Sequence, residues 1–323
     1  MTRVIPGGVV LGLALAVAFP GAVASQDVDR LAARCLLVST ASATPCLEGA
    51  ITAQAVLAQT GLLAGLGSEV AGSPTTLGRR VGSSPRLALS LRAGGLEARL
   101  PDLTDRQNTP SREAVFFLPT VHGSVALGVF DGFRLRPTVG GFLSLDLLAQ
   151  TSVIFFPEGR GFAGNVSALS VGLRVGVIRE TFTLPGVTLS VSRRLLGVVR
   201  MADVLLGDPT QVEIDPTVSA YRLTVGKDLF AVGLLLGAGW DVYSTDARIT
   251  VADDLRGIVT VKGPLKAQRA LFFGSASWSL LVLQLSAELG WAHGVSSPAG
   301  YSGADFDPAR GSWFGSLAAR LTL

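Results

Sequence analysis

The residues of this chain with the clearest potential for catalysis are one histidine and two nearby aspartates. His293 is followed by Asp305 and Asp307, and a histidine beside a carboxylate can act as a general base. No motif for a serine or cysteine nucleophile accompanies them. The other histidine, His122, is far away in the sequence and is expected to be a hydrogen-bonded filler. We therefore expect no catalytic residue and no enzyme activity.

The N-terminal residues have the pattern of an export signal. Arg3 precedes the apolar stretch 9–19, and Ala22-Val23-Ala24 forms a small-x-small cleavage site. The pattern predicts a signal peptide over residues 1–24 and a mature chain that begins at Ser25. The alternative is an uncleaved membrane anchor.

Export gives a meaning to Cys35 and Cys46, which are the only cysteines of the chain. A metal site would need further ligands, and both histidines are distant. In an oxidising compartment we expect the two thiols to form a disulfide that closes a short loop. The segment 302–311 holds two aspartates but lacks the ligand spacing of a calcium loop. We expect no metal and no cofactor.

Residues 26–70 have a helical pattern, and residues 72–85 look like a linker with a basic pair at Arg79 and Arg80. Gly61, Gly65 and Gly67 do not form a dinucleotide loop, because the preceding strand and the required spacing are missing. Two interpretations of these glycines stay open: a close contact between helices through small residues, or a helix of low stability.

The composition is unusual for a water-soluble domain. Charged residues make up 16% of the chain and the mean hydropathy is +0.48, whereas soluble domains have about 25% charged residues. Yet beyond the N-terminus no apolar run reaches the ~18 residues of a membrane helix. The net charge of +3 is too small to indicate nucleic-acid binding.

From residue 86 onwards, apolar residues recur at every second position. In 281–291, leucine, alanine and tryptophan alternate with valine, glutamine, serine, glutamate and glycine. Such a period predicts strands, and we count about ten of them (range 8–14). The expected strands are 87–92, 121–129, 143–147, 169–177, 187–191, 221–225, 232–240, 269–280, 281–291 and 316–323.

The two faces of these strands suit two different solvents. In a sandwich the bulky apolar face would point inward and the other face would be polar. Here the second face consists of glycine, serine, alanine and scattered charges, which cannot fill a dry core. The pattern therefore predicts an all-β fold, an antiparallel transmembrane β-barrel with lipid outside and a polar lumen inside.

Connection lengths and aromatic residues fit the same fold. The connections 131–133, 226–229 and 280–282 are tight turns, whereas 193–216, 245–268 and 292–312 are long loops. Barrels of the outer membrane have short periplasmic turns and long external loops, so both termini and the Cys35–Cys46 loop are expected in the periplasm. We also expect interface aromatics at the outer strand ends. They are Trp240, Tyr243, Trp291 and Trp313.

Extending the period places seven charges in the lumen. They are Arg92, Asp146, Arg174, Arg222, Asp241, Glu288 and Arg320. Neighbouring strands should bring Asp146 near Arg174 and Glu288 near Arg320, while Asp241 has no obvious partner. In a narrow barrel such pairs would close the lumen, and we expect an occluded resting state.

The predicted signal peptide, the two-residue period over 86–323 and a chain that ends on its last strand resemble the outer-membrane β-barrel proteins of Gram-negative bacteria. Leu323 departs from the aromatic residue that usually ends such chains. Residues 26–70 also resemble the N-terminal plug of hydrophobic-compound channels of the long-chain fatty-acid transporter family. The resemblance implies three parts: a signal peptide (1–24), a helical periplasmic or plug segment with linker (25–85) and the barrel (86–323).

The same resemblance implies a location in the outer membrane and two functions of different kinds. One is a passive transporter or narrow channel for small or apolar molecules. The other is a non-conducting structural or surface-interaction barrel, and an outer-membrane hydrolase is the weaker rival. The partners implied are membrane lipid and the barrel-assembly machinery, with no nucleic acid and with an unknown small-molecule substrate. Arg193-Arg194 could meet lipopolysaccharide phosphates or simply be solvated.

Overall fold

The structure is a computed structural model that describes residues 22–39, 43–78, 85–104, 112–133, 141–157, 160–253, 255–297 and 306–323. The expected signal peptide, apart from its last three residues, and the basic pair Arg79-Arg80 lie outside these ranges, as does Asp305. Neither described helix combines the length and the apolar composition that a membrane-spanning helix needs.

The described strands form a closed antiparallel barrel of ten strands, as the two-residue period predicts. Each strand pairs with its neighbour in the chain, and β12 returns to pair with β1 over Leu96↔Phe314 to Ala88↔Thr322. The ten strands are β1 (Arg86–Pro101), β2 (Glu113–Phe130), β3 (Ser144–Ile154), β4 (Val166–Ile178), β5 (Gly186–Leu196), β8 (Thr217–Leu229), β9 (Val232–Asp253), β10 (Gly257–Leu280), β11 (Leu283–Ala292) and β12 (Ser312–Thr322).

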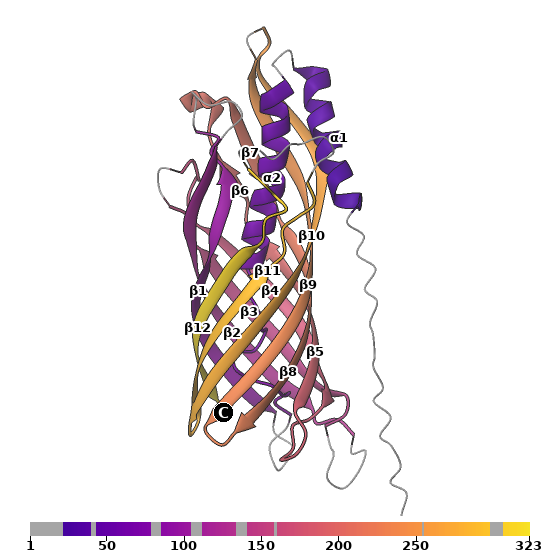
Figure 1. Cartoon of the computed structure of the whole chain (residues 1–323), viewed down its shortest axis with the longest axis vertical. Coiled ribbons are helices and arrows are strands. Elements are labelled where there is room, and N and C mark those ends of the chain that lie inside the picture. Colours follow the sequence, from indigo (N-terminus) through magenta and orange to yellow (C-terminus); the bar gives the residue numbers. More distant parts are fainter. Residues whose placement is uncertain are drawn as a thin grey trace, which may run out of the picture.

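The barrel has two unlike ends (Figure 1). At the turn end, which we define by the tight connections after β8 and β10, Leu323 pairs with Leu87. At the hairpin end, which we define by the Asp253–Gly257 tip, β9 and β10 rise above the other strands. There the short strands β6 (Val199–Met201) and β7 (Thr210–Ile214), with the 3-10 helix η1 (Val204–Leu206) between them, extend the sheet beside β9.

The apolar side of the sheet changes partway along the strands. On β9, outward Leu234 and Leu236 are exposed, whereas further up inward Ile249 and Val251 are fully buried and outward Arg248 is exposed. The outer surface is thus apolar near the turn end and polar near the hairpin end. The apolar part is the surface expected to meet lipid, because outer-membrane barrels carry an apolar belt about 25 Å tall.

This reversal corrects the expected connections. Residues 245–268 are the upper halves of β9 and β10 rather than a loop, because their outward side faces water. The connection after β2 is also longer than the expected tight turn at 131–133, since β3 begins only at Ser144.

Two helices stand at the hairpin end, α1 (Ala22–Val38) and α2 (Ala43–Leu63). The expected disulfide between Cys35 and Cys46 joins them and is confirmed. Because Arg34 and Arg256 link α1 to the β9–β10 hairpin, the disulfide lies at the end opposite Leu323. The expectation that it shares an end with the chain terminus is therefore wrong.

The helix expected to reach Val70 ends earlier. Helix α2 stops at Leu63, and residues 64–78 continue without regular secondary structure down the inside of the barrel. Almost every residue from Glu48 to Gly78 is buried. For α2 this agrees with a helix that is apolar on nearly all sides. We call residues 43–78 the plug segment.

Candidate functional site

The lumen is the candidate site, because the predicted charges and the plug segment meet there. The plug segment follows the barrel from one end to the other. At the hairpin end a Cβ on Gly49 would lie 2.7 Å from Cγ2 of Ile249, and at the turn end a Cβ on Gly128 would lie 2.1 Å from the carbonyl oxygen of Gly78. Glycine is needed at Gly128, because the backbones of β2 and the plug segment approach too closely there for a side chain.

An ion pair between Glu69 of the plug segment and Arg194 of β5 joins the plug to the barrel wall. Nη2 of Arg194 donates to Oε1 of Glu69 over 2.6 Å, and the Ser192 hydroxyl donates to the same oxygen over 2.8 Å. The Arg194 side chain is fully buried, and its guanidinium lies against Gly65, where a Cβ would be 1.9 Å from Cζ. Removing one partner of a buried pair typically costs about 3–5 kcal/mol.

Glu288 of β11 binds the plug segment rather than Arg320. Its Oε2 accepts hydrogen bonds from the Ser68 hydroxyl (2.5 Å) and the Ser68 backbone N–H (3.1 Å). Arg92 of β1 completes the group, with 2.7 Å from Nη2 to the Ser68 carbonyl oxygen and 3.9 Å from Nη1 to Glu288 Oε1. The predicted ion pair between Glu288 and Arg320 is therefore wrong. Ser68 of the plug segment lies beside Glu288, where the prediction assumed only the lumen.

Asp241 of β9 has a partner, contrary to expectation. Arg222 of β8 makes two hydrogen bonds to its carboxylate, of 2.5 and 3.1 Å, and the Tyr243 hydroxyl lies 3.2 Å from Oδ2. Arg222 also donates to the carbonyl oxygens of Gly67 (3.0 Å) and Leu66 (3.3 Å). This one arginine thus ties two neighbouring strands to the plug segment.

Asp146 of β3 and Arg174 of β4 lie side by side, at the positions that neighbouring strands predict. Nη2 of Arg174 is 2.7 Å from Oδ2 of Asp146, and the strands pair these two residues directly. The carboxylate also accepts the Leu77 backbone N–H over 3.1 and 3.0 Å. The pair therefore holds the lower part of the plug segment, which the sequence did not indicate.

His122 faces the lumen as a hydrogen-bonded side chain. Its Nδ1 lies 2.9 Å from Nε2 of Gln150, which in turn donates to the Ala64 carbonyl oxygen over 3.0 Å. His293 is elsewhere: it is an exposed residue directly after β11, near the hairpin end, with its Nδ1 3.1 Å from the Gly294 carbonyl oxygen.

Arg320 lies on the lumen side of β12, opposite Gln284 and Ser90. Its Nε and Nη1 are buried and have no hydrogen-bond partner among the described residues.

Three of the four expected interface aromatics mark the change between the apolar and polar outer surfaces. Trp291 and Trp313 are cross-strand partners, and Trp240 pairs with Tyr221 of β8. Tyr243 does not belong with them: its ring is fully buried inside the barrel against Gly61 of α2. The period of two already separates Tyr243 from Trp240, because three positions apart means opposite faces.

The same parity argument identifies a residue that the sequence analysis missed. Arg193 and Arg194 are neighbours and must point to opposite sides of β5. Arg193 faces outward and donates to the Ser219 hydroxyl over 2.5 Å, while Arg194 enters the lumen. Of the two arginines, only Arg193 is therefore exposed on the outer surface.

No protein-family model matches the chain, and no curated protein matches it. Among solved structures it is similar to the outer-membrane protease OmpT of Escherichia coli, with 9% identity, 78% of this chain and 100% of that chain covered, and a TM-score of 0.41. The translocator domain of the autotransporter NalP of Neisseria meningitidis has 11% identity, coverage of 76% and 90%, and a TM-score of 0.34. An outer-membrane channel of Pseudomonas putida F1 has 10% identity, coverage of 76% and 97%, and a TM-score of 0.35.

These three proteins are a protease, a translocator domain and a channel, so the likeness does not select a function. The closed strand order and the apolar belt define the class of this chain: it has the fold of an outer-membrane β-barrel protein.

Proposed function

We propose that this protein is an outer-membrane barrel that its own N-terminal segment keeps closed, and that it acts as a structural or surface-interaction barrel rather than as an open channel. The observation that carries the proposal is the plug segment, which contacts lumen residues from the hairpin end to the turn end. In this proposal the signal peptide directs export, and the hairpin end faces outward because external connections are the longer ones.

The charges of the lumen support a closed state. Four buried arginines pair with four buried carboxylates. One of these carboxylates, Glu69, belongs to the plug segment, and each of the other three pairs makes at least one hydrogen bond to the plug. The eight residues are Arg92, Arg174, Arg194, Arg222, Glu69, Asp146, Asp241 and Glu288. Buried charges are tolerated when they are paired and hydrogen-bonded. Moving the plug would leave Arg194 without its carboxylate and would remove the plug's hydrogen bonds from the other three pairs.

A conditional channel is the second candidate, and the lining of the lower lumen favours it. The wall there carries small and polar side chains, among them Ser124, Ser170, Thr188, Ser275 and Ser277. Such a lining suits small polar solutes once the plug has moved. It suits apolar molecules less, because their surface would stay in contact with water in a polar lumen and would gain no hydrophobic stabilisation.

His293 contacts the Gly294 carbonyl oxygen and the Trp291 ring, and the proposal assigns it no catalytic role. We extend the proposal to a non-enzymatic protein whose partners are lipid and the machinery that assembles barrels.

Conductance of the full chain in a planar lipid bilayer tests the closed state. We expect no steady current from the intact protein and brief openings from Glu69→Ala, which leaves Arg194 without its carboxylate. Glu213→Ala is the matched control, because Glu213 pairs with Arg200 and Arg248 on the outward side of the sheet, away from the lumen. A wide, steady current from the intact protein would overturn the proposal.

A further inference from the structure

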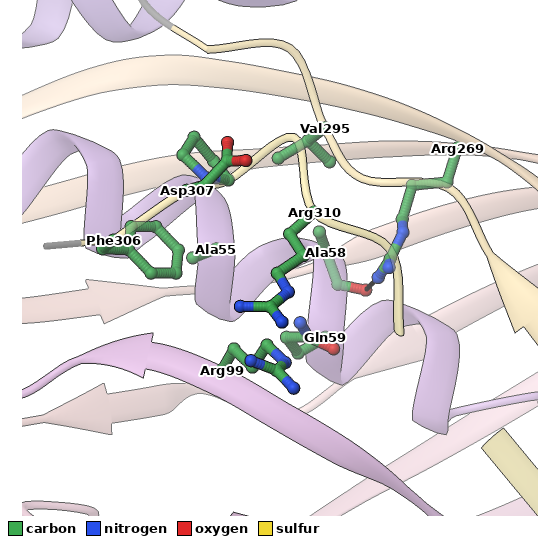
Figure 2. Close-up of a pocket in the computed structure, with 10 residues that line it drawn as sticks. Ala55, Ala58, Gln59, Arg99, Arg269, Val295, Phe306, Asp307 and Arg310 are labelled. Atoms are coloured by element: carbon green, nitrogen blue, oxygen red, sulfur yellow. Dashed lines mark hydrogen bonds between the residues drawn. The ribbon is translucent and has the colours of Figure 1, made fainter. Parts of the chain in front are cut away.

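A small cavity at the hairpin end is lined by three arginines, and the closed lumen does not account for it. It lies between α2, the wall of the barrel and the segment before β12, and its charged and amide lining is Arg99, Arg269, Arg310, Gln59 and Asp307. Figure 2 shows how these five residues surround the hollow. We call it the arginine cavity.

Arg269 of β10 is the buried member of the group. It is 2% exposed, and its hydrogen bonds go to backbone carbonyl oxygens, those of His293 (2.6 Å), Ala58 (3.3 Å) and Ala292 (3.5 Å). Within the described parts of the chain no carboxylate lies at ion-pair distance from it. A buried cation that meets only carbonyl dipoles keeps an unbalanced positive charge, and this charge favours an anion nearby.

Gln59 provides an independent sign of a missing ligand. Its side chain is 7% exposed and its Nε2 lies 3.2 Å from the Ser312 hydroxyl oxygen, but its Oε1 has no partner among the described residues. A serine hydroxyl can either donate or accept. The amide can therefore present either its oxygen or its NH2 group to the cavity, and a ligand with both kinds of group would satisfy it.

The two other arginines differ in how firmly they are held. Arg310 is 57% exposed and lies 3.9 Å from Glu113, so its side chain is free to turn toward a ligand. Arg99 is 20% exposed and pairs with both Glu113 (3.5 Å) and Glu97. The hollow measures about 280 Å³, including space open to solvent, and the centre of a water-sized group can occupy only about 10 Å³ of it. One oxygen of a larger group fits there, and the rest of the group would lie toward solvent beside the exposed Arg310.

We propose that the arginine cavity binds a phosphate group through Arg99, Arg269, Arg310 and Gln59. A guanidinium offers paired N–H donors that match phosphate oxygens. A hydrogen phosphate group also carries an O–H that can donate to Gln59 Oε1, which chloride cannot do. Since the cavity touches α2, an occupied site would also fasten the plug segment to the wall.

The phosphate can be free in solution or part of a lipid headgroup, and two arms of one experiment distinguish these sources. In the first arm, inorganic phosphate is titrated into the full chain in lipopolysaccharide-free detergent, with chloride at equal ionic strength as the reference. In the second arm, the full chain is placed in phosphatidylcholine vesicles with and without phosphatidic acid. Thermal unfolding is the readout in both arms. A higher Tm with either probe supports the proposal and names the source, and no shift with either one overturns it.

Two variants decide whether the arginine cavity is the site. Arg310→Gln keeps the size of an exposed side chain and should weaken phosphate binding by about tenfold or more, because one charge-assisted hydrogen bond is lost. Arg99→Gln should act in the same direction. Arg248→Gln is the matched control, since Arg248 is an exposed arginine at the same end that pairs with Glu213 and does not line the cavity. Equal phosphate affinity in Arg310→Gln and the unmodified chain would overturn the proposal.

Discussion

The position of the membrane belt can be tested on a single strand with two arginine substitutions. Leu236 and Ala252 both lie on the outward side of β9 and are both exposed, Leu236 to 73%. The two residues differ only in their position along the barrel axis. Leu236 lies below Trp240, on the apolar outer surface, whereas Ala252 lies near the Asp253–Gly257 tip.

The expected cost follows from the geometry of the strand. A strand rises about 3.3 Å per residue and tilts by about 40° in a membrane barrel. Leu236 therefore lies about 10 Å below Trp240, close to the middle of a belt that is about 25 Å tall. By the same arithmetic Ala252 lies about 30 Å above Trp240, in water.

Leu236→Arg should lower the free energy of unfolding by about 2–4 kcal/mol, the cost of an arginine at the bilayer midplane. Ala252→Arg should change it by no more than about 0.5 kcal/mol, as for an ordinary surface substitution. Both values can be measured by guanidinium unfolding in phospholipid vesicles, followed by tryptophan fluorescence and extrapolated linearly. Equal costs at the two positions, or a neutral Leu236→Arg, would show that the belt is misplaced.

Three further predictions concern the closure and the hairpin end. Gly65→Ala should destabilise the barrel by about 1–3 kcal/mol and produce current openings, because its Cβ would meet Arg194 at 1.9 Å; Gly123→Ala, where the nearest atom is 3.7 Å away, should do neither. Reducing the Cys35–Cys46 disulfide should cost about 3 kcal/mol in unfolding experiments, because it frees a closed loop of the unfolded chain, and no change would contradict this reasoning. Burial alone would raise the pKa of Glu213, but its two arginine partners outweigh burial and hold the pKa below the usual range. The stabilising contact of Glu213 is therefore complete above the ordinary glutamate pKa and is lost as the pH falls through the lowered value. Proteolysis of the β6–β7 region should accelerate as the pH falls through that value, but not in the Glu213→Gln variant.

The sequence predicts the barrel well where lipid and lumen are the two solvents. Leu285 and Gln284 illustrate this: they are neighbours, and the structure exposes Leu285 while it buries Gln284 in the lumen. The period alone also brings Asp146 next to Arg174, because the direct pairing of neighbouring strands depends only on local register.

The prediction fails where the environments of the two strand faces change. Residues 245–268 still alternate, but water replaces lipid outside, and α1 and α2 replace the polar lumen inside. The apolar phase therefore reverses, and the stretch resembles a loop. The partners of the plug segment fail for another reason. Glu69 and Arg194 are separated by 125 positions, and no local pattern indicates which lumen charge a threaded segment will meet.

The disulfide has a mechanical consequence for the plug segment. Ten strands about 4.8 Å apart and tilted by about 40° enclose a ring about 20 Å wide between backbones, and side chains leave room for little more than one helix about 10 Å thick. Two helices joined by Cys35–Cys46 are too wide to slide through it toward the turn end. In the other direction the segment is tethered, since only the residues between Gly78 and Arg86 separate it from β1 and they stretch to about 28 Å.

The plug segment therefore cannot leave the barrel in either direction. If residues 64–78 slide toward the hairpin end, the stretched linker enters the ring behind them, and a chain still occupies the lumen. An empty pore can arise only when the backbone between α2 and β1 is cut or deleted, and the width of any opening in the intact protein is limited by the strand that remains inside.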